Sequence, residues 1–241
     1  MTVGLLHGFA GDPGVWDDVR VPDARAIALP GHGGGDVEPG WDANLDAVAR
    51  ALAGCDVVVG YSLGARVALG LVATGRCARA VLISVNPGIS DLERPARRTS
   101  DAELARMLRE YDLATFFRRW QAQPLFATQA RVPAERLAAR RARRLRHDPE
   151  QLARSLEEMG LAAMPDYRPV FPRDRVALIA GADDAKYVEL ARGLGMPFEA
   201  IAASGHDPTL EQPAALAAAI TRGMRLVARR GSAAGGSTKA T

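Results

Sequence analysis

Six short apolar runs alternate with amphipathic segments along this chain, and the alternation predicts its architecture. Each run ends at a glycine, a proline or a polar loop. Runs separated by helical stretches are typical of parallel strands joined by crossover helices. We therefore expect an α/β protein with a mostly parallel sheet flanked by helices. The six runs are Val3–Leu6, Ala24–Leu29, Val57–Val59, Ala80–Val85, Arg175–Gly181 and Phe198–Ala203.

The segments around these runs carry apolar residues at helical spacing. Residues 41–54 repeat their apolar positions in this way and end at Gly54, a residue that commonly terminates helices. A last helix is predicted from Pro208 to Val227. The residues that follow are small, polar and rich in glycine, which predicts a disordered tail.

The gap between the fourth and fifth runs is much longer than the others. It contains helical sequence rich in alanine, leucine and arginine and no convincing strand. We interpret it as a helical cap inserted into the core. The expected organisation is a core of residues 1–90 and 167–229, a cap of residues 91–166 and a disordered tail of residues 230–241.

A serine stands where the third run changes into a helix. The surrounding GYSLG has the spacing G-x-S-x-G of the nucleophile elbow, a sharp strand-to-helix turn. Gly60 and Gly64 are expected because the backbone doubles back so closely that a Cβ two residues either side of Ser62 would clash. Such a turn raises the hydroxyl above the sheet and leaves the N–H of Leu63 free at a helix N-terminus. The alternative is an ordinary turn that contains a serine.

Partners for the serine follow later strands. A serine becomes reactive when an imidazole takes its proton and a carboxylate orients that imidazole. His206 follows the last strand, and Asp183 and Asp184 follow the preceding one, which gives the order Ser, Asp, His of the α/β-hydrolase fold. We choose Asp184 as the acid from its G-x-x-D position, and we expect Asp183 to cap the following helix. Asp207 is poorly placed to reach back to its neighbour's ring.

A His-Gly dipeptide follows the first strand, in LLHGFAG. In this fold the N–H after that dipeptide joins the N–H after the nucleophile to form an oxyanion hole. Here those groups belong to Phe9 and Leu63. We expect His7, and also His32 in LPGHGGG, to brace their loops rather than to react.

Seven stretches in order carry a closer resemblance. They are LLHGFAGDPGVW, LPGHG, GYSLGAR, NPG, RWQAQPLFA, GADDAKY and SGH. Together they resemble the 2-succinyl-6-hydroxy-2,4-cyclohexadiene-1-carboxylate synthase family of menaquinone biosynthesis, over almost the whole chain. HG, GxSxG and the final GH are common to the superfamily, whereas Arg66, the Trp120 segment and DDAKY are more selective. Ala65 departs from the second glycine usual in the family, although it keeps the small size.

The resemblance implies an elimination and no hydrolysis. Members of the family release pyruvate from 2-succinyl-5-enolpyruvyl-6-hydroxy-3-cyclohexene-1-carboxylate. By this resemblance Ser62, activated by His206 and Asp184, removes a ring proton as a general base. Negative charge then develops on the succinyl carbonyl oxygen, near the N–H groups of Phe9 and Leu63.

The family's substrate carries several carboxylates, for which arginine is the matching side chain. By motif position Arg66, Arg97 and Arg144 resemble the substrate arginines of the family, and Tyr61 and Trp120 are expected to line the pocket. We expect most other arginines of the cap to be solvated surface. The implied ligand is a small polycarboxylate.

Composition narrows the other possibilities. The net charge is +3, but aromatic residues make up only 5% and no nucleic-acid-binding motif is present, so we expect no nucleic-acid partner. No leader or long apolar stretch is evident, and Cys55 and Cys77 are isolated, which favours the reducing cytoplasm and no membrane attachment. The four histidines lack ligand spacing, and neither G-x-G-x-x-G nor a P-loop occurs, so we expect no metal and no cofactor. The oligomeric state stays open.

Other functions remain possible on the same fold. A serine carboxylesterase or thioesterase would keep the same triad and is distinguished by its products. A non-catalytic binding module would have no reason to keep Ser62, Asp184 and His206 together. Dehalogenases and epoxide hydrolases of similar fold carry aspartate where Ser62 stands.

Overall fold

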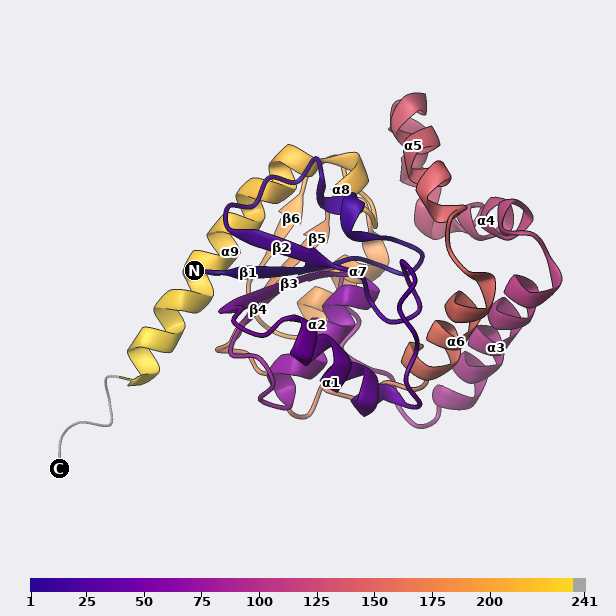
Figure 1. The fold of residues 1–241 in the computed structure, drawn as a ribbon. Coiled ribbons are helices and arrows are strands. Elements are labelled where there is room, and N and C mark those ends of the chain that lie inside the picture. The colour runs from indigo at the N-terminus through magenta and orange to yellow at the C-terminus, as the bar shows by residue number, and fades with distance from the viewer. Residues whose placement is uncertain (236–241) are drawn as a thin grey trace.

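The computed structural model describes residues 1–235 of the 241-residue chain (Figure 1). Its centre is a six-stranded sheet in the order β2-β1-β3-β4-β5-β6, and every neighbouring pair of strands is parallel. The six apolar runs predicted as strands are confirmed. The strands are β1 (Val3–Leu6), β2 (Ala24–Ile27), β3 (Val57–Tyr61), β4 (Ala80–Ile83), β5 (Val176–Gly181) and β6 (Phe198–Ile201).

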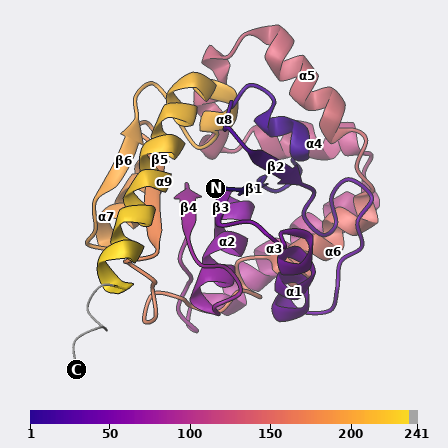
Figure 2. The ribbon, with the colours of Figure 1, turned by 60° about the vertical axis from the view of Figure 1, so that its left-hand side comes forward.

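Helices cover both faces of the sheet (Figure 2). On one face α1 (Trp41–Ala51), α2 (Leu63–Ala73) and α7 (Ala185–Gly193) pack on the strands, and on the other lie α9 (Pro213–Gly235) and the short 3₁₀ helix η1 (Pro13–Trp16). The four central strands, β1, β3, β4 and β5, are buried on both faces, as their continuous apolar runs require, whereas the edge strands β2 and β6 are mostly half-buried. Among the described residues, each helix is too short or too polar to cross a lipid bilayer.

The C-terminal helix differs from the prediction at both ends. A short helix α8 (Pro208–Glu211) ends before α9, because Pro213 lacks an N–H and restricts the residue before it. The helix α9 then continues to Gly235, so residues 230–235, predicted to be disordered, are helical. The guanidinium of Arg230 donates to the carbonyls of Arg173 and Val176 and attaches this part of the helix to the core. Residues 236–241 of the predicted tail lie outside the described residues.

Between β4 and β5, within residues 84–175, every regular element is helical. We call the predicted cap, residues 91–166, the helical insert. Figure 1 shows it beyond the carboxyl ends of the strands, with α3 and α6 side by side. A buried cluster that includes Phe116, Phe117 and Leu152 packs against Ala10 in the loop after β1. The elements are α3 (Arg94–Glu110), α4 (Leu113–Gln121), η2 (Pro124–Arg131), α5 (Ala134–Arg144) and α6 (Pro149–Met159).

Candidate active site

The turn between β3 and α2 is strained in the way that the G-x-S-x-G spacing predicts. Ser62 has φ +53° and ψ −109°, a combination that side-chain-bearing residues rarely adopt. A Cβ on Gly60 would overlap the carbonyl of Gly64, and a Cβ on Gly64 would overlap the carbonyl of Leu6. Only glycine therefore fits on either side, and the turn presents the serine at the edge of the sheet.

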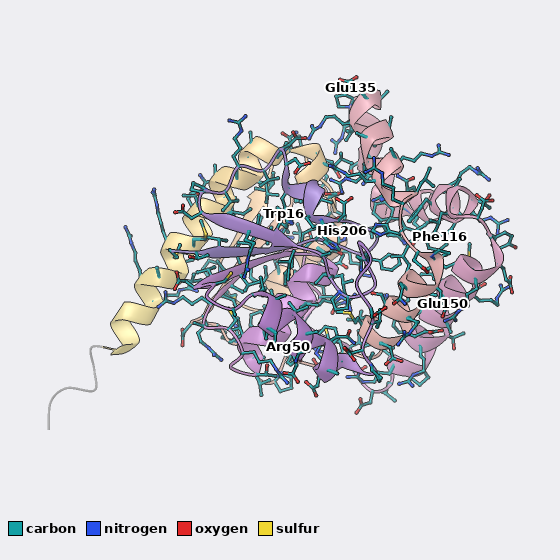
Figure 3. All side chains as sticks on the ribbon, viewed as in Figure 1. Trp16, Arg50, Phe116, Glu135, Glu150 and His206 are labelled. Atoms are coloured by element: carbon teal, nitrogen blue, oxygen red, sulfur yellow. The ribbon has the colours of Figure 1, made fainter. Side chains whose placement is uncertain are left out.

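Three predicted side chains meet at this edge. The Oγ of Ser62 lies 3.0 Å from Nε2 of His206, and Nδ1 of His206 lies 2.8 Å from Oδ2 of Asp184. A carboxylate only accepts hydrogen bonds, so Nδ1 carries the hydrogen and Nε2 is left to accept the serine proton. Figure 3 places His206 between the sheet and the helical insert. The geometry is that of a serine activated through a chain of hydrogen bonds.

The two neighbouring aspartates face elsewhere. Asp183 is 40% exposed and pairs with Arg131 at 2.6 Å. Our expectation that it caps the next helix is wrong, because the side chain of Asp184 accepts from the N–H of Tyr187 and is itself the cap of α7. Asp207 turns away from the imidazole beside it and pairs with Arg140. Asp184 is thus the carboxylate that contacts His206.

The two N–H groups predicted to form an oxyanion hole belong to the loop after β1 and to the first residue of α2. Gly8 packs against Tyr61, so the loop after β1 lies beside the serine turn. The N–H of Ser62 donates to Ile83 and that of Gly64 donates to His7. Within residues 1–235, by contrast, the N–H groups of Phe9 and Leu63 donate to no protein group. Both are available to an anion, and that of Leu63 opens helix α2, where the helix dipole favours negative charge.

Two buried histidines hold the adjoining loops, as predicted. Nε2 of His7 accepts from the N–H of Leu29 at 3.0 Å, and Nε2 of His32 accepts from the N–H of Ala10 at 3.0 Å. Their Nδ1 atoms donate to backbone carbonyls. Burial lowers the pKa of His7 to about 4 and that of His32 well below its ordinary value, so both rings are neutral at pH 7.

A cavity of about 640 Å³ opens above the serine. The sheet-edge loops form its floor and the helical insert forms its roof. Among the described residues, no group of three or more histidine, cysteine, aspartate or glutamate side chains could hold a metal ion. All five side chains predicted to contact substrate line this cavity, namely Tyr61, Arg66, Arg97, Trp120 and Arg144.

Arg66 and Arg97 form one cationic side of the cavity. Nη1 of Arg66 donates to the carbonyl of Met159 at 3.0 Å. Burial, with the nearby charge of Arg97, lowers the pKa of Arg66 to about 10, which still leaves it charged at neutral pH. Arg97 is 36% exposed and pairs at 2.8 Å with the buried carboxylate of Asp101. Arg66 therefore contributes the less compensated charge.

Arg144 forms a second cationic side of the cavity, and its positive charge is less compensated by neighbouring groups than that of Arg66. Its guanidinium lies 5.1 Å from the ring centre of Trp120 and 5.8 Å from that of Phe117. The side chain is buried, and its Nε and Nη1 have no partner in the described part of the chain. Burial, with the nearby charge of Arg140, lowers the pKa of Arg144 to about 10. A buried guanidinium with free donors is suited to a carboxylate ligand.

Three further residues line the cavity without having been predicted as site residues. The ring of Tyr187 lies 4.4 Å from that of His206, and Phe126 lies 4.4 Å from Trp120. Both residues belong to motifs quoted above, DDAKY and QPLFA, and the aromatic side chains of these motifs could have identified them from the sequence. Arg140 precedes Arg144 by four residues, and this spacing places both on one face of a helix.

Comparisons with known proteins agree with this geometry. A model described as the alpha/beta hydrolase family matches residues 5–219. Two relatives are 2-succinyl-6-hydroxy-2,4-cyclohexadiene-1-carboxylate synthases. The one from Citrobacter koseri is 33% identical and covers 92% of this chain and 93% of its own. The one from Escherichia coli is 31% identical and covers 92% of each.

Solved structures have the same fold. MenH from S. aureus superposes with a TM-score of 0.84 at 25% identity, covering 96% of this chain and 94% of its own. A thermophilic esterase from Thermogutta terrifontis superposes with a TM-score of 0.73 at 26% identity, covering 94% and 90%. The chain therefore belongs to the α/β-hydrolase family and, within it, to the family of 2-succinyl-6-hydroxy-2,4-cyclohexadiene-1-carboxylate synthases.

Proposed function

We propose that this chain is a carbon–oxygen lyase. It eliminates pyruvate from 2-succinyl-5-enolpyruvyl-6-hydroxy-3-cyclohexene-1-carboxylate and leaves 2-succinyl-6-hydroxy-2,4-cyclohexadiene-1-carboxylate. The names of its relatives support this reaction. The observation that carries it is a hydrogen-bonded Ser62, His206 and Asp184 opening into a cavity with the unpartnered guanidinium of Arg144.

In the proposed mechanism Ser62 acts as a general base. Its Oγ takes the proton from ring carbon 2, which lies next to the succinyl carbonyl, while its own proton passes to Nε2 of His206. The electron pair forms a double bond between carbons 2 and 3, and the former 3,4 double bond moves to carbons 4 and 5. The bond from carbon 5 to the enolpyruvyl oxygen breaks and releases the enolate of pyruvate. This enolate takes up a proton at its methylene carbon to become pyruvate, and the loss of one proton from His206 restores the neutral Ser62 and His206.

The N–H groups of Phe9 and Leu63 stabilise the charge in this step. As the proton leaves, negative charge develops on the succinyl carbonyl oxygen. Two preorganised donors facing that oxygen each contribute about 3 to 4 kcal/mol to the transition state. Asp184 keeps Nδ1 of His206 protonated and orients the ring, so that Nε2 can receive the serine proton.

The cationic sides of the cavity bind the carboxylates. The substrate carries three carboxylates, and the insert and helix α2 present Arg66, Arg97 and Arg144 to the cavity. Tyr61 and Trp120 supply apolar walls for the ring. In this assignment residues 91–166 act as a cap that encloses a small polycarboxylate, and the cytoplasm is the expected location.

Pyruvate release tests the proposal directly. The purified protein is supplied with the enolpyruvyl substrate, and any pyruvate is reduced by lactate dehydrogenase while NADH absorbance is followed. We expect steady turnover that Ser62→Ala slows about a thousandfold or more. A p-nitrophenyl ester is offered in parallel. Ester cleavage without pyruvate release would exclude the lyase and favour hydrolysis.

A serine esterase or thioesterase is the second candidate, because the same triad serves acyl transfer and the Thermogutta terrifontis esterase has the same fold. Ester hydrolysis passes through an acyl group bound to the serine, whereas proton abstraction forms no covalent bond. Mass spectrometry after a rapid acid quench during turnover of the enolpyruvyl substrate should therefore find unmodified protein. An adduct on the Ser62 peptide would contradict the elimination.

A further inference from the structure

One buried ion pair joins the helical insert to the loop that carries His206. Nη1 of Arg140, on α5, lies 2.9 Å from Oδ2 of Asp207, and the two side chains are 5% and 1% exposed. Nη2 of Arg140 donates to the hydroxyl of Thr209, which in turn donates to Oδ1 of Asp207. Burial alone would raise the pKa of Asp207, but Arg140 and Thr209 hold it below its ordinary value. The carboxylate is thus charged and fully engaged at neutral pH.

Each residue of this ion pair lies close along the chain to a predicted site residue. Asp207 directly follows His206. Arg140 lies one helical turn before Arg144 on α5, and both line the cavity. A displacement of this pair would therefore move the imidazole and the unpartnered guanidinium of Arg144 together.

Two other contacts attach the same part of the insert to the triad loops. The hydroxyl of Thr128, on η2, donates to Glu211, whose other carboxylate oxygen accepts from the N–H of Gly205, the residue before His206. Arg131 pairs with Asp183, the residue before Asp184. The segment from η2 to α5 thus touches the loops of both the acid and the imidazole.

We propose that Arg140 is a positioning residue. Its pair with Asp207 holds His206 against Ser62 and sets α5 so that Arg144 faces the same cavity. The role is indirect, because Arg140 acts through Asp207 and through its own helix and transfers no proton. The proposal rests on the proposed function only for its effect on substrate, since the alignment of His206 with Ser62 can be measured without substrate.

Removing one partner or both distinguishes this role from others. Arg140→Met leaves a buried carboxylate without its cation beside His206, and the loop must shift to solvate it. Arg140→Met with Asp207→Asn removes both charges and keeps the approximate volumes, a change that buried pairs tolerate far better. If Arg140 instead bound substrate, adding Asp207→Asn would restore nothing.

The experiment follows Ser62 with a neutral fluorophosphonate, which reacts only with a serine activated by its histidine. We expect Arg140→Met to slow labelling and kcat by about tenfold to a hundredfold, as small misplacements do. KM should also rise, because the shift of α5 would displace Arg144 from its position in the cavity. The double variant should recover most of the labelling rate. Arg140→Lys keeps the charge but lacks the planar guanidinium, so its labelling rate should lie between those of Arg140→Met and the parent. Arg136→Met, which removes an exposed pair with Asp18 from the same helix, is the control and should match the parent.

Two results would overturn the proposal. One is an Arg140→Met protein that melts at lower temperature but labels at the parent rate well below its melting point. The other is a double variant as slow as Arg140→Met alone. If Arg140→Met does not fold, Asp207→Asn and Arg140→Lys carry the same comparison. If the parent releases no pyruvate, the lyase assignment fails, and the labelling rates still decide the role of Arg140.

Discussion

The floor and the roof of the cavity differ in how completely their buried polar side chains are hydrogen-bonded. Among the described residues, ten buried side-chain nitrogen and oxygen atoms have no hydrogen-bond partner, and eight of them belong to the helical insert. Arg140, Arg144, Asp101 and Ser155, which contribute five of these atoms, also line the cavity. In the floor, by contrast, both ring nitrogens of His7, His32 and His206 are engaged.

This difference separates two tasks. The bonded histidines of the floor hold the reacting groups in place before substrate arrives, which is what preorganised catalysis needs. Unpartnered donors in the roof carry an energetic penalty that a ligand can relieve by accepting from them. The floor therefore suits chemistry common to the fold, and the roof suits recognition of a particular ligand.

Breaking the floor should have the largest effect. Ser62→Ala removes the proposed base while leaving the turn and the roof intact, so kcat should fall about a thousandfold or more with little change in KM. Steady-state pyruvate release measures both. Because the triad acts as a unit, adding His206→Ala should change little more. Independent, multiplicative losses would contradict this coupling.

Breaking the roof should affect binding instead. Arg144→Ala removes the guanidinium with free donors, and a charge-assisted hydrogen bond contributes about 1.5 to 3 kcal/mol, so KM should rise about tenfold to a hundredfold. Arg143→Ala is the matched control on the same helix, because Arg143 already pairs with Asp17 at 3.0 Å. Equal effects of the two variants would show that Arg144 does not recognise the substrate.

The buried histidines of the floor should make stability depend on pH. The pKa of His7 falls from 6.5 in the unfolded chain to about 4 in the fold, so the unfolded state binds more protons between these values. Its contribution is present above pH 6.5 and is lost as pH falls towards 4, by up to about 3 kcal/mol. Urea unfolding across this range measures the decline. A His7→Gln protein, which has no ring to protonate, should decline less, and an equal slope would refute the assignment.

Polar groups of the insert that face solvent should matter least. Arg109 pairs with Glu150 and Glu157 on α6 and is 38% exposed. Exposed pairs contribute little, so Arg109→Ala should lower the free energy of unfolding by about 1 kcal/mol or less and leave kcat and KM unchanged. Thermal melts measure the change in stability, and pyruvate release measures kcat and KM. A changed KM would mean that the outer face of the insert also controls the cavity.

Local rules explain what the sequence alone determined. Apolar runs identified the strands, because the central strands of a parallel sheet are buried on both faces. Helical spacing of apolar residues identified the helices between them. The elbow was recognisable because the strained serine and the close approach of Gly60 to Gly64 lie within five residues, whereas the overlap that excludes a Cβ on Gly64 comes from the carbonyl of Leu6 on β1. Asp184 was chosen from a short motif next to a strand, and its contact with His206 agrees with that choice.

Only the tertiary structure decided how distant side chains are paired. Sequence could not show that Asp207 pairs with Arg140, 67 positions away, or that Asp183 pairs with Arg131 instead of capping a helix. The arginines of the insert look alike along the chain, yet docking on the sheet edge pairs Arg140 and leaves Arg144 free. The length of α9 likewise depends on Arg230 reaching the carbonyls of another segment. Such contacts depend on how packed elements meet, which local patterns do not encode.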